Sequence, residues 1–281
     1  MHDEAARRLG SAVDARRITE RAAGFEGSHF VIGLDEDVPA RAVPFFQAMV
    51  ERRATGEPLQ YVVQRWGFRH LDLFVDRRVL IPRPETEQVV EAALGEARRL
   101  GDLMAGPGPG SLVVADLGTG SGAIALSLAL ELPGAEVWAT DRSTDALAVA
   151  RANLAGVGTL VATRVRLAEG SWFAALPDDR RGRLDLIVSN PPYVAEDDQL
   201  PSEVADWEPT GALVAGPSGL EDIELIVAGA PDWLSRPGAL VLELAPHQAE
   251  AVLALALAAG FAHAEVRPDL AGRPRALVAR I

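Results

Sequence analysis

The stretch LVVADLGTGSGA, residues 112–123, decides the fold of this chain. Its first four residues, Leu112 to Ala115, have the length and apolar character of a buried strand. The acid Asp116 comes next, and three glycines spaced two residues apart follow. Because helical spacing of apolar residues begins at the last of these glycines, the stretch predicts a strand, a glycine-rich turn and a helix in succession.

The same alternation of strands and helices extends from this stretch to the end of the chain. Strand-length apolar runs are Leu112–Ala115, Glu136–Thr140, Leu184–Val188, Ala239–Leu244, Ala264–Val266 and Ala276–Ala279. Helical segments between them are Gly122–Glu131, Thr144–Leu154, Leu220–Leu234 and His247–Ala259. This alternation predicts an α/β fold with a mostly parallel sheet that helices cover on both faces. In such folds ligands bind beyond the carboxyl ends of the strands.

Three consecutive domains or segments are expected along the chain. Residues 1–58 have the spacing of short amphipathic helices, punctuated by glycine and proline, and form a small helical N-terminal domain. Residues 59–84 are the connector, where Tyr61–Val63 and the alternating Leu71, Leu73 and Val75 suggest short strands in a hairpin. Residues 85–281 form the larger domain, which begins with a helix after Pro84. The glycine- and proline-rich run at 106–110 is expected to be a loop.

The composition excludes several classes of protein. The formal net charge is −13, so tight non-specific binding to nucleic acid is not expected. There are no cysteines, which excludes disulfides and thiolate sites, and the five histidines show no metal-ligand spacing. The charged N-terminus does not have the pattern of a signal peptide, and no apolar stretch has the ~20 residues that a membrane span needs. We therefore expect a soluble, cytoplasmic protein without a metal or a membrane partner.

The glycine-rich turn predicts a cofactor site. Gly118, Gly120 and Ala123 also satisfy a dinucleotide-binding fingerprint. Asp116, directly before the glycines, favours a cationic ligand group over a pyrophosphate, and the amino-acid end of S-adenosylmethionine carries an ammonium. Asp141 ends the next strand, where an acid can bind ribose hydroxyls. Its alternative role is to cap the following helix.

A second motif, Asn190-Pro191-Pro192-Tyr193, ends the strand at Leu184–Val188. The prolines stiffen the backbone and so fix the Asn190 carboxamide and the Pro191 carbonyl, two acceptors for a substrate NH2. Tyr193 can pack on a flat substrate group. Holding both hydrogens of a planar amide or amine orients its nitrogen for attack on an activated methyl group. The alternative is a proline-stiffened structural turn.

Together these motifs resemble the HemK/PrmC family of protein-glutamine methyltransferases. The resemblance includes RRATGEPLQYVV, LFVDRRVLIPRPETE, DLGTGSGAIALSLA, GSWFAAL, DLIVSNPPYV and WEPTGALVAGPSGL. It implies a class I, Rossmann-like methyltransferase domain with a seven-stranded sheet, one strand antiparallel, and a helical N-terminal domain for substrate recognition. It also implies that the substrate is the glutamine of a Gly-Gly-Gln motif in peptide-chain release factors.

The expected site follows from the motifs and the resemblance. S-adenosylmethionine would contact Asp116, Gly118, Thr119, Gly120, Ser121, Gly122, Asp141, Trp172 and Asn190, with Trp172 beside the adenine. Asn190, Pro191 and Tyr193 would be catalytic, and with Pro192 they would bind the substrate glutamine. Glu85 and Glu87 lie near the active site by the same resemblance, although both are also favourable acids in a first helical turn.

Other functions remain open at this point. A DNA or RNA adenine methyltransferase would share the fold, the cofactor and the Asn-Pro-Pro-Tyr motif, but it would usually carry a basic surface. A dinucleotide-dependent oxidoreductase would give that motif no role, and a non-catalytic cofactor sensor would not need it. Six acids and no bases between Glu196 and Glu208 suggest either a solvated loop or an acidic rim that steers a basic substrate.

Overall fold

The computed structural model describes residues 1–24, 27, 30, 32–33, 39–103 and 112–281. The chain forms two compact units. The helical unit contains Met1–Arg65, Val75–Arg77 and Leu200–Trp207; the sheet unit contains Trp66–Phe74, Arg78–Gln199 and Glu208–Ile281. Both units are discontinuous in sequence, whereas the ranges expected from the sequence, 1–58, 59–84 and 85–281, are continuous. The glycine- and proline-rich run at 106–110 lies outside the described residues.

Short amphipathic helices build the helical unit. They are α1 (His2–Leu9), α2 (Ala12–Ala23), α4 (Ala42–Ala54), α5 (Leu59–Val63) and, from a distant part of the chain, α10 (Ser202–Ala205). Ser11 caps α2, because its hydroxyl accepts a hydrogen bond from the Asp14 amide at 3.2 Å. The apolar faces of α1, α2, α4 and α5 share one core, which includes Ile18, Phe46 and Met49.

The expectation of a strand at Tyr61–Val63 is wrong, since these residues belong to helix α5. The amides of Tyr61 and Val62 donate to the Pro58 carbonyl, each at 3.0 Å, which starts a helical turn. All three side chains are buried, so none alternates outward as a strand with one solvated face would require. Packing against the core of the helical unit therefore overrides the β propensity of tyrosine and valine.

A seven-stranded sheet forms the centre of the sheet unit. Its strands are β3 (Val113–Leu117), β4 (Glu136–Asp141), β5 (Val165–Glu169), β6 (Leu184–Ser189), β9 (Leu234–Glu243), β10 (His263–Pro268) and β11 (Pro274–Arg280). They lie in the order β10-β11-β9-β6-β3-β4-β5, and β11 is antiparallel to both of its neighbours. This confirms the expected mostly parallel, seven-stranded sheet.

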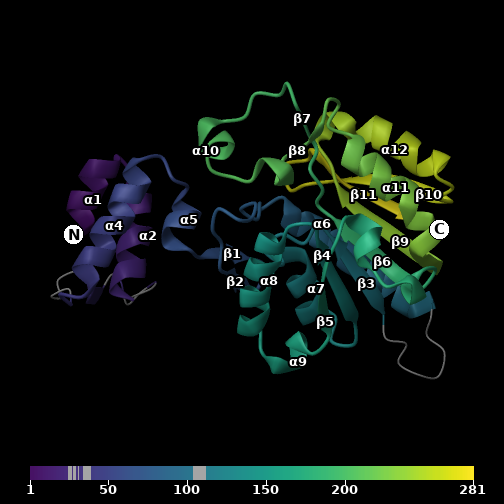
Figure 1. Cartoon of the computed structure of the whole chain (residues 1–281), viewed down its shortest axis with the longest axis horizontal. Helices are drawn as coiled ribbons and strands as arrows, with labels where there is room; N and C mark the ends of the chain where they lie inside the picture. Colours follow the sequence, from purple (N-terminus) through teal and green to yellow (C-terminus); the bar gives the residue numbers. More distant parts are fainter. Residues whose placement is uncertain (25–26, 28–29, 31, 34–38, 104–111) are drawn as a thin grey trace. The chain divides into compact units, whose positions relative to one another are not determined.

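Helices cover this sheet on both faces, as Figure 1 shows. Helices α7 (Ala123–Glu131) and α8 (Thr144–Gly156) lie on one face, and α6 (Thr86–Leu103) packs beside α7. Helices α11 (Glu221–Trp233) and α12 (Ala249–Ala258) lie on the other face. Shorter elements connect these layers: α9 (Thr159–Ala162), η2 (Trp172–Ala175), η3 (Asp178–Arg180), η4 (Thr210–Ala212) and η5 (Pro246–Gln248).

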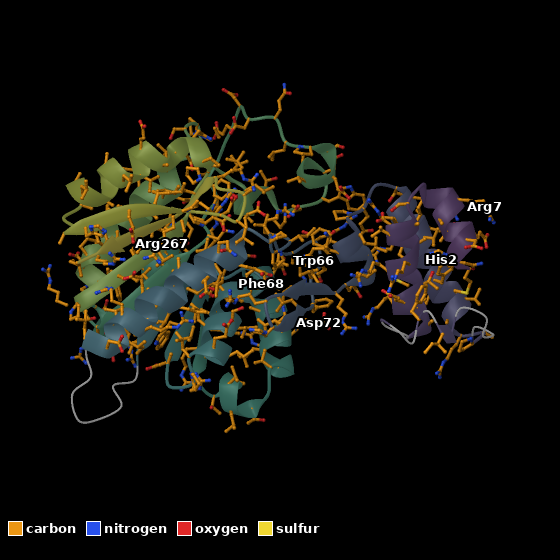
Figure 2. All side chains as sticks on the ribbon, turned by 180° about the vertical axis from the view of Figure 1, so that it is seen from behind. His2, Arg7, Trp66, Phe68, Asp72 and Arg267 are labelled. Carbon is orange, nitrogen blue, oxygen red and sulfur yellow. The ribbon has the colours of Figure 1, made fainter. Side chains whose placement is uncertain are left out.

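Two small sheets accompany the main one. The hairpin of β1 (Trp66–Phe68) and β2 (Leu71–Leu73) confirms the expected strand at Leu71–Leu73. Phe68, labelled with Trp66 in Figure 2, is buried, while the Trp66 indole nitrogen donates to the Pro82 carbonyl at 3.0 Å. Strands β7 (Val194–Ala195) and β8 (Val214–Gly216) form a short parallel pair. Among the described residues, none of the helices combines the length and apolar character needed to span a bilayer.

The strand order places the functional motifs side by side. From β3 the chain proceeds to β4 and β5 on one side, then returns to β6 on the other side of β3. Asp116 is opposite Val188, and Leu117 is opposite Ser189, in the parallel pair β3 and β6. The glycine-rich turn and the Asn-Pro-Pro-Tyr motif therefore leave the sheet from adjacent carboxyl ends, at the point where ligands bind in open α/β sheets.

Candidate active site

The glycine-rich turn after β3 has a backbone that glycine alone adopts easily. Gly118, Gly120 and Gly122 have φ angles of +75°, +56° and +87°, in the left-handed region. The amides of Gly118 and Thr119 both donate to the Thr140 carbonyl on β4, at 2.9 and 2.8 Å. The turn is thus tied to the neighbouring strand, and it leads directly into α7.

Asp116 lies beneath this turn and is fully buried. One carboxylate oxygen, Oδ2, accepts hydrogen bonds from the Thr119 hydroxyl at 2.6 Å and from the Ala125 amide at 3.0 Å. Burial raises the pKa of Asp116 to about 7, although these two hydrogen bonds oppose the shift. Asp116 therefore organises the turn and the first turn of α7 from below.

Asp141, at the end of β4, holds the turn from the side. Its Oδ2 accepts from the Gly120 amide and its Oδ1 from the Ser143 amide, both at 2.9 Å. The cap of α8 is Ser143, whose hydroxyl accepts from the Ala146 amide at 3.1 Å. The structure therefore assigns the capping role to Ser143 and leaves Asp141 at the edge of the glycine-rich turn.

Trp172, in the 3-10 helix η2, lies against the glycine-rich turn. It has a φ of +46°, which is unusual for a residue with a side chain. The ring of its neighbour Phe173 stacks on Trp233 of α11, with centroids 5.7 Å apart. A β-carbon on Gly229 of α11 would lie 2.6 Å from the Phe173 ring, so glycine there makes this contact possible. The anchored Phe173 holds Trp172 in its strained conformation.

The Asn-Pro-Pro-Tyr turn is fixed at several points. Before it, the Ser189 hydroxyl donates to the Leu117 carbonyl at 2.6 Å. The Asn190 side-chain nitrogen, Nδ2, donates to the Thr86 hydroxyl at 3.3 Å. The Tyr193 hydroxyl donates to the Glu243 carboxylate at 3.2 Å, and the Tyr193 carbonyl accepts from Gln248 at 3.0 Å. Burial, and then the charge of Glu243, raise the pKa of Tyr193, so this phenol stays protonated.

A cavity connects the two motifs. Its volume of about 250 Å³ far exceeds the ~10–15 Å³ that one water needs, so it suits a small organic molecule. Eight residues expected in the site line it: Gly118, Thr119, Gly120, Ser121, Asp141, Trp172, Asn190 and Pro192. Further lining residues include Thr86, Arg142 and Ser143. Two short segments also contribute, the first through Arg78, Val79, Leu80 and Pro82 and the second through Pro209, Gly211 and Ala212.

Four residues expected in the site do not line this cavity: Asp116, Gly122, Pro191 and Tyr193. Asp116 is beneath the turn, and Gly122 faces Leu126 of α7, whose side chain would lie 3.1 Å from an added β-carbon. Pro191 is buried. Tyr193 packs at the edge of the hydrophobic core with its hydroxyl on Glu243. Their expected contacts with a ligand remain predictions, whereas their contacts with the turns are structural.

Sequence reasoning missed three residues around the site: Thr86, Glu208 and Glu243. Glu208 is buried, and its two oxygens accept from the Ile81 amide at 3.0 Å and from Arg83 at 2.5 Å, joining the two lining segments named above. Glu243 is fully buried at the end of β9. A signal was available for Glu243, because it is an acid at a strand end, like Asp116 and Asp141.

The residues around the cavity fit S-adenosylmethionine. Glycines whose φ angles exclude most side chains let a ligand approach the backbone closely. Asp141 offers carboxylate oxygens suited to ribose hydroxyls, and Trp172 offers an aromatic surface. Asn190, directly after β6, lines the same space, and its carboxamide is of a kind that can hydrogen-bond to a second, planar ligand group.

This fold and site define a class I methyltransferase. Residues 106–206 match the model of the "Methyltransferase small domain", and residues 3–63 match that of the "PrmC N-terminal domain". Among solved structures, the hMettl16 catalytic domain has a TM-score of 0.54 at 16% identity over 85% of this chain and 80% of that one. A methyltransferase from Pyrococcus furiosus has a TM-score of 0.51 at 17% identity, covering 75% and 89%.

Curated relatives identify the particular family. A release factor glutamine methyltransferase of Cereibacter sphaeroides is 42% identical over 99% of this chain and 92% of its own length. Relatives with the same description from Moorella thermoacetica and Burkholderia pseudomallei are also 42% identical, over 98% and 96% of this chain and 95% and 92% of their own lengths. The chain belongs to the release factor glutamine methyltransferase family.

Proposed function

We propose that this chain transfers a methyl group from S-adenosylmethionine to the side-chain amide nitrogen of the glutamine in the Gly-Gly-Gln motif of peptide-chain release factors. The observation that carries the proposal is that Gly118–Ser121 and Asn190 line the same cavity. A cofactor on the glycine-rich turn and an amide on Asn190 would then occupy neighbouring parts of one space. Membership of the family supports the same substrate.

The chain's own residues supply binding and orientation. The turn Gly118–Ser121 and Asp141 would hold the cofactor, and Trp172 would lie beside its adenine. S-adenosylmethionine, when bound, supplies an electrophilic methyl group on a sulfonium. Asp116 holds Thr119 and the start of α7 from below, and so supports the turn that binds the cofactor.

Orientation matters because an amide nitrogen is a weak nucleophile whose lone pair is delocalised. The side-chain oxygen of Asn190 and the Pro191 carbonyl each accept a hydrogen bond from the glutamine NH2. Pro192 and Tyr193 shape the surface beside this group. Fixing both hydrogens directs the nitrogen at the methyl carbon, and positioning of this kind can lower a barrier by ~7–11 kcal/mol in favourable cases.

The partner is a protein rather than a nucleic acid. The formal net charge of −13 disfavours a phosphate backbone, and Glu196 and Asp197 are exposed just after the Asn-Pro-Pro-Tyr motif. A release factor must approach ribosomal RNA, so a basic neighbourhood around its Gly-Gly-Gln loop would be attracted by these acids. The helical unit is proposed to recognise this substrate, and the reaction is proposed to take place in the cytoplasm.

Labelled S-adenosylmethionine tests the proposal directly. The purified chain is incubated with a release factor, with the same factor carrying Gln→Ala in its Gly-Gly-Gln motif, and with DNA and RNA. Label on the native factor that disappears with the Gln→Ala change is the expected result. Label on DNA or RNA, with none on the release factor, would replace the substrate assignment by an adenine methyltransferase.

A further inference from the structure

Two buried carboxamides are bonded to the ends of the glycine-rich turn and the Asn-Pro-Pro-Tyr turn. Asn153 lies on α8 and is 7% exposed, and Gln248 ends η5 and is 3% exposed. A carboxamide has two N–H donors and one acceptor oxygen. Both side chains use donors and acceptor alike on backbone groups that are far apart in sequence. Each can therefore tie one turn to another part of the chain.

Asn153 ties the glycine-rich turn to the residue that follows β2. Its Nδ2 donates to the Ser121 carbonyl at 2.8 Å and to the Phe74 carbonyl at 3.0 Å. Its Oδ1 accepts from the Phe74 amide at 2.7 Å, so both backbone groups of Phe74 are paired with this one side chain. Because Ser121 lines the cavity, Asn153 fixes the end of the turn on which the cofactor is proposed to bind.

Gln248 ties the Asn-Pro-Pro-Tyr turn in the same way. Its Nε2 donates to the Tyr193 carbonyl at 3.0 Å and to the Gly219 carbonyl at 2.9 Å. Its Oε1 accepts from the Ala245 amide at 3.0 Å. Gly219 permits the close approach, since its φ is +76° and an added β-carbon would lie 2.7 Å from the Tyr193 carbonyl oxygen. Gln248 thus fixes the peptide group that ends the motif.

The opposite end of each turn is tied to a neighbouring strand. The amides that open the glycine-rich turn donate to the Thr140 carbonyl on β4, and the Ser189 hydroxyl, just before Asn190, donates to the Leu117 carbonyl on β3. Each turn is therefore held by the sheet at its start and by a carboxamide at its end. The two prolines of the second turn have fixed φ angles but free ψ angles, so the tie beyond them restricts the course of the chain.

We propose that Asn153 and Gln248 are separate positioning residues, Asn153 for the cofactor and Gln248 for the methyl acceptor. The inference rests on the proposed function, because that function assigns the acceptor to the Asn-Pro-Pro-Tyr turn. Both side chains act through backbone carbonyls, so neither needs to touch a ligand. Their hydrogen-bond partners belong to different turns, and loss of one tie should leave the site of the other ligand in place.

Substitutions of similar size remove each tie. In Gln248→Met the kcat of labelled methyl transfer should fall ~10-fold or more, because a misplacement of about 1 Å can cost ~100-fold in rate. Its Kd for S-adenosylmethionine, from isothermal titration, should stay within about twofold, since separate sites act independently. In Asn153→Leu this Kd should rise about fivefold or more, the factor that one lost hydrogen bond represents. Its kcat at saturating cofactor should stay within about threefold.

Two further variants separate hydrogen bonding from packing. Gln248→Glu and Asn153→Asp keep the shape of each side chain and its acceptor oxygen, but replace the NH2 group by a second oxygen. Each should change the same parameter as the apolar variant of that residue, and these variants decide if an apolar variant does not fold. Val278→Ala, at a buried residue of β11, is the control for stability. It should lower the urea midpoint and leave both kcat and Kd unchanged.

Each outcome decides the inference. Equal losses of kcat and of cofactor affinity in both sets of variants would overturn it, because a general loosening of the fold changes both parameters together. An unchanged kcat in the Gln248 variants, or an unchanged Kd in the Asn153 variants, would overturn the role of that residue. Failure of the proposed function is a separate result, in which the native chain leaves the release factor unlabelled. The comparison of Kd values needs no acceptor, and kcat is then compared on whichever acceptor takes the label.

Discussion

The ring of Trp172 lies directly against Gly118. A β-carbon placed on Gly118 would come within 3.2 Å of Cζ3 of the indole, closer than such contacts normally are. Both residues line the cavity. Two independent reasons therefore favour glycine at this position. Its φ of +75° is unfavourable for other residues, and the indole packed over it leaves little room for a β-carbon.

Gly118→Ala should weaken cofactor binding, because the new methyl group forces Trp172 to move and strains the turn. A loss of roughly tenfold or more in affinity for S-adenosylmethionine corresponds to ~1.4 kcal/mol. Isothermal titration with the purified chain measures it. The double variant Gly118→Ala with Trp172→Leu should lose less than the sum of the two single changes, since the residues touch. Additive losses would contradict a direct contact between them.

Asp141→Asn should raise the Kd for S-adenosylmethionine by about tenfold, because the amide group cannot accept from both the Gly120 and Ser143 amides and also bind ribose hydroxyls. Asp145→Asn, in the first turn of α8, removes the same charge from an exposed side chain and is the matched control. Its Kd should stay within about twofold. Similar effects in the two variants would assign the loss to net charge instead of contact.

Neutralising the exposed acids Glu196 and Asp197 should slow association with a release factor. Electrostatic steering acts on the association rate and is screened by salt, so the double variant Glu196→Gln, Asp197→Asn should show a weaker salt dependence. Stopped-flow association between 25 and about 300 mM salt measures this. Asp178→Asn with Asp179→Asn, two exposed acids of η3, is the control. A salt dependence equal to that of the native chain would show that the acids merely solvate the loop.

Glu96 should make the fold sensitive to acid. Burial would raise its pKa, but the guanidinium groups of Arg280 and Arg99 more than offset that effect and hold it at about 2, below the ordinary 4.5. Arg267 of β10, labelled in Figure 2, also pairs with it, at 3.3 Å. Because the pKa is lower in the folded chain, this stabilisation is complete above about pH 4.5 and is lost as the pH falls toward 2.

Glu96→Gln should therefore lower the free energy of unfolding at pH 7 by ~1.5–3 kcal/mol, the range for hydrogen bonds to charged groups. It should also flatten the fall in stability between pH 4.5 and 2. Urea unfolding at several pH values measures both. Glu224→Gln, an exposed glutamate of α11, should change neither. If the free energy of unfolding of Glu96→Gln fell between pH 4.5 and 2 as steeply as that of the native chain, other carboxylates would be the cause of the acid sensitivity.

Local patterns in the sequence predicted much of this fold. The strand expected at Leu112–Ala115 is found at Val113–Leu117, and its glycine-rich turn and the following helix are confirmed, because each is determined by neighbouring residues. Strand β5 was not anticipated from the residues. It lies at the edge of the sheet with Val165 as its one buried residue, so it lacks a continuous apolar run. Helix α5 was mistaken for a strand because five residues are too few to show a helical period.

The candidate site divides in the same way. Residues within the two motifs were predicted from their own short stretches, and six of them line the cavity. Thr86 lies 104 residues from Asn190, and Glu243 lies 50 residues from Tyr193. Contacts at such separations depend on the strand order and on where α6 packs, and no local pattern contains that information. The supporting hydrogen bonds therefore required the structure.

The pairing of β3 with β6 fixes the spacing between the glycine-rich turn and the Asn-Pro-Pro-Tyr motif. Leu117 is opposite Ser189, one residue before the glycine-rich turn on one strand and one residue before Asn190 on the other. Neighbouring strands are ~4.8 Å apart, a spacing that backbone hydrogen bonds fix whatever the side chains are. The gap between proposed donor and acceptor is thus inherited from the sheet itself. Loops around the cavity can diversify to admit a different acceptor while the distance that the methyl group travels stays constant.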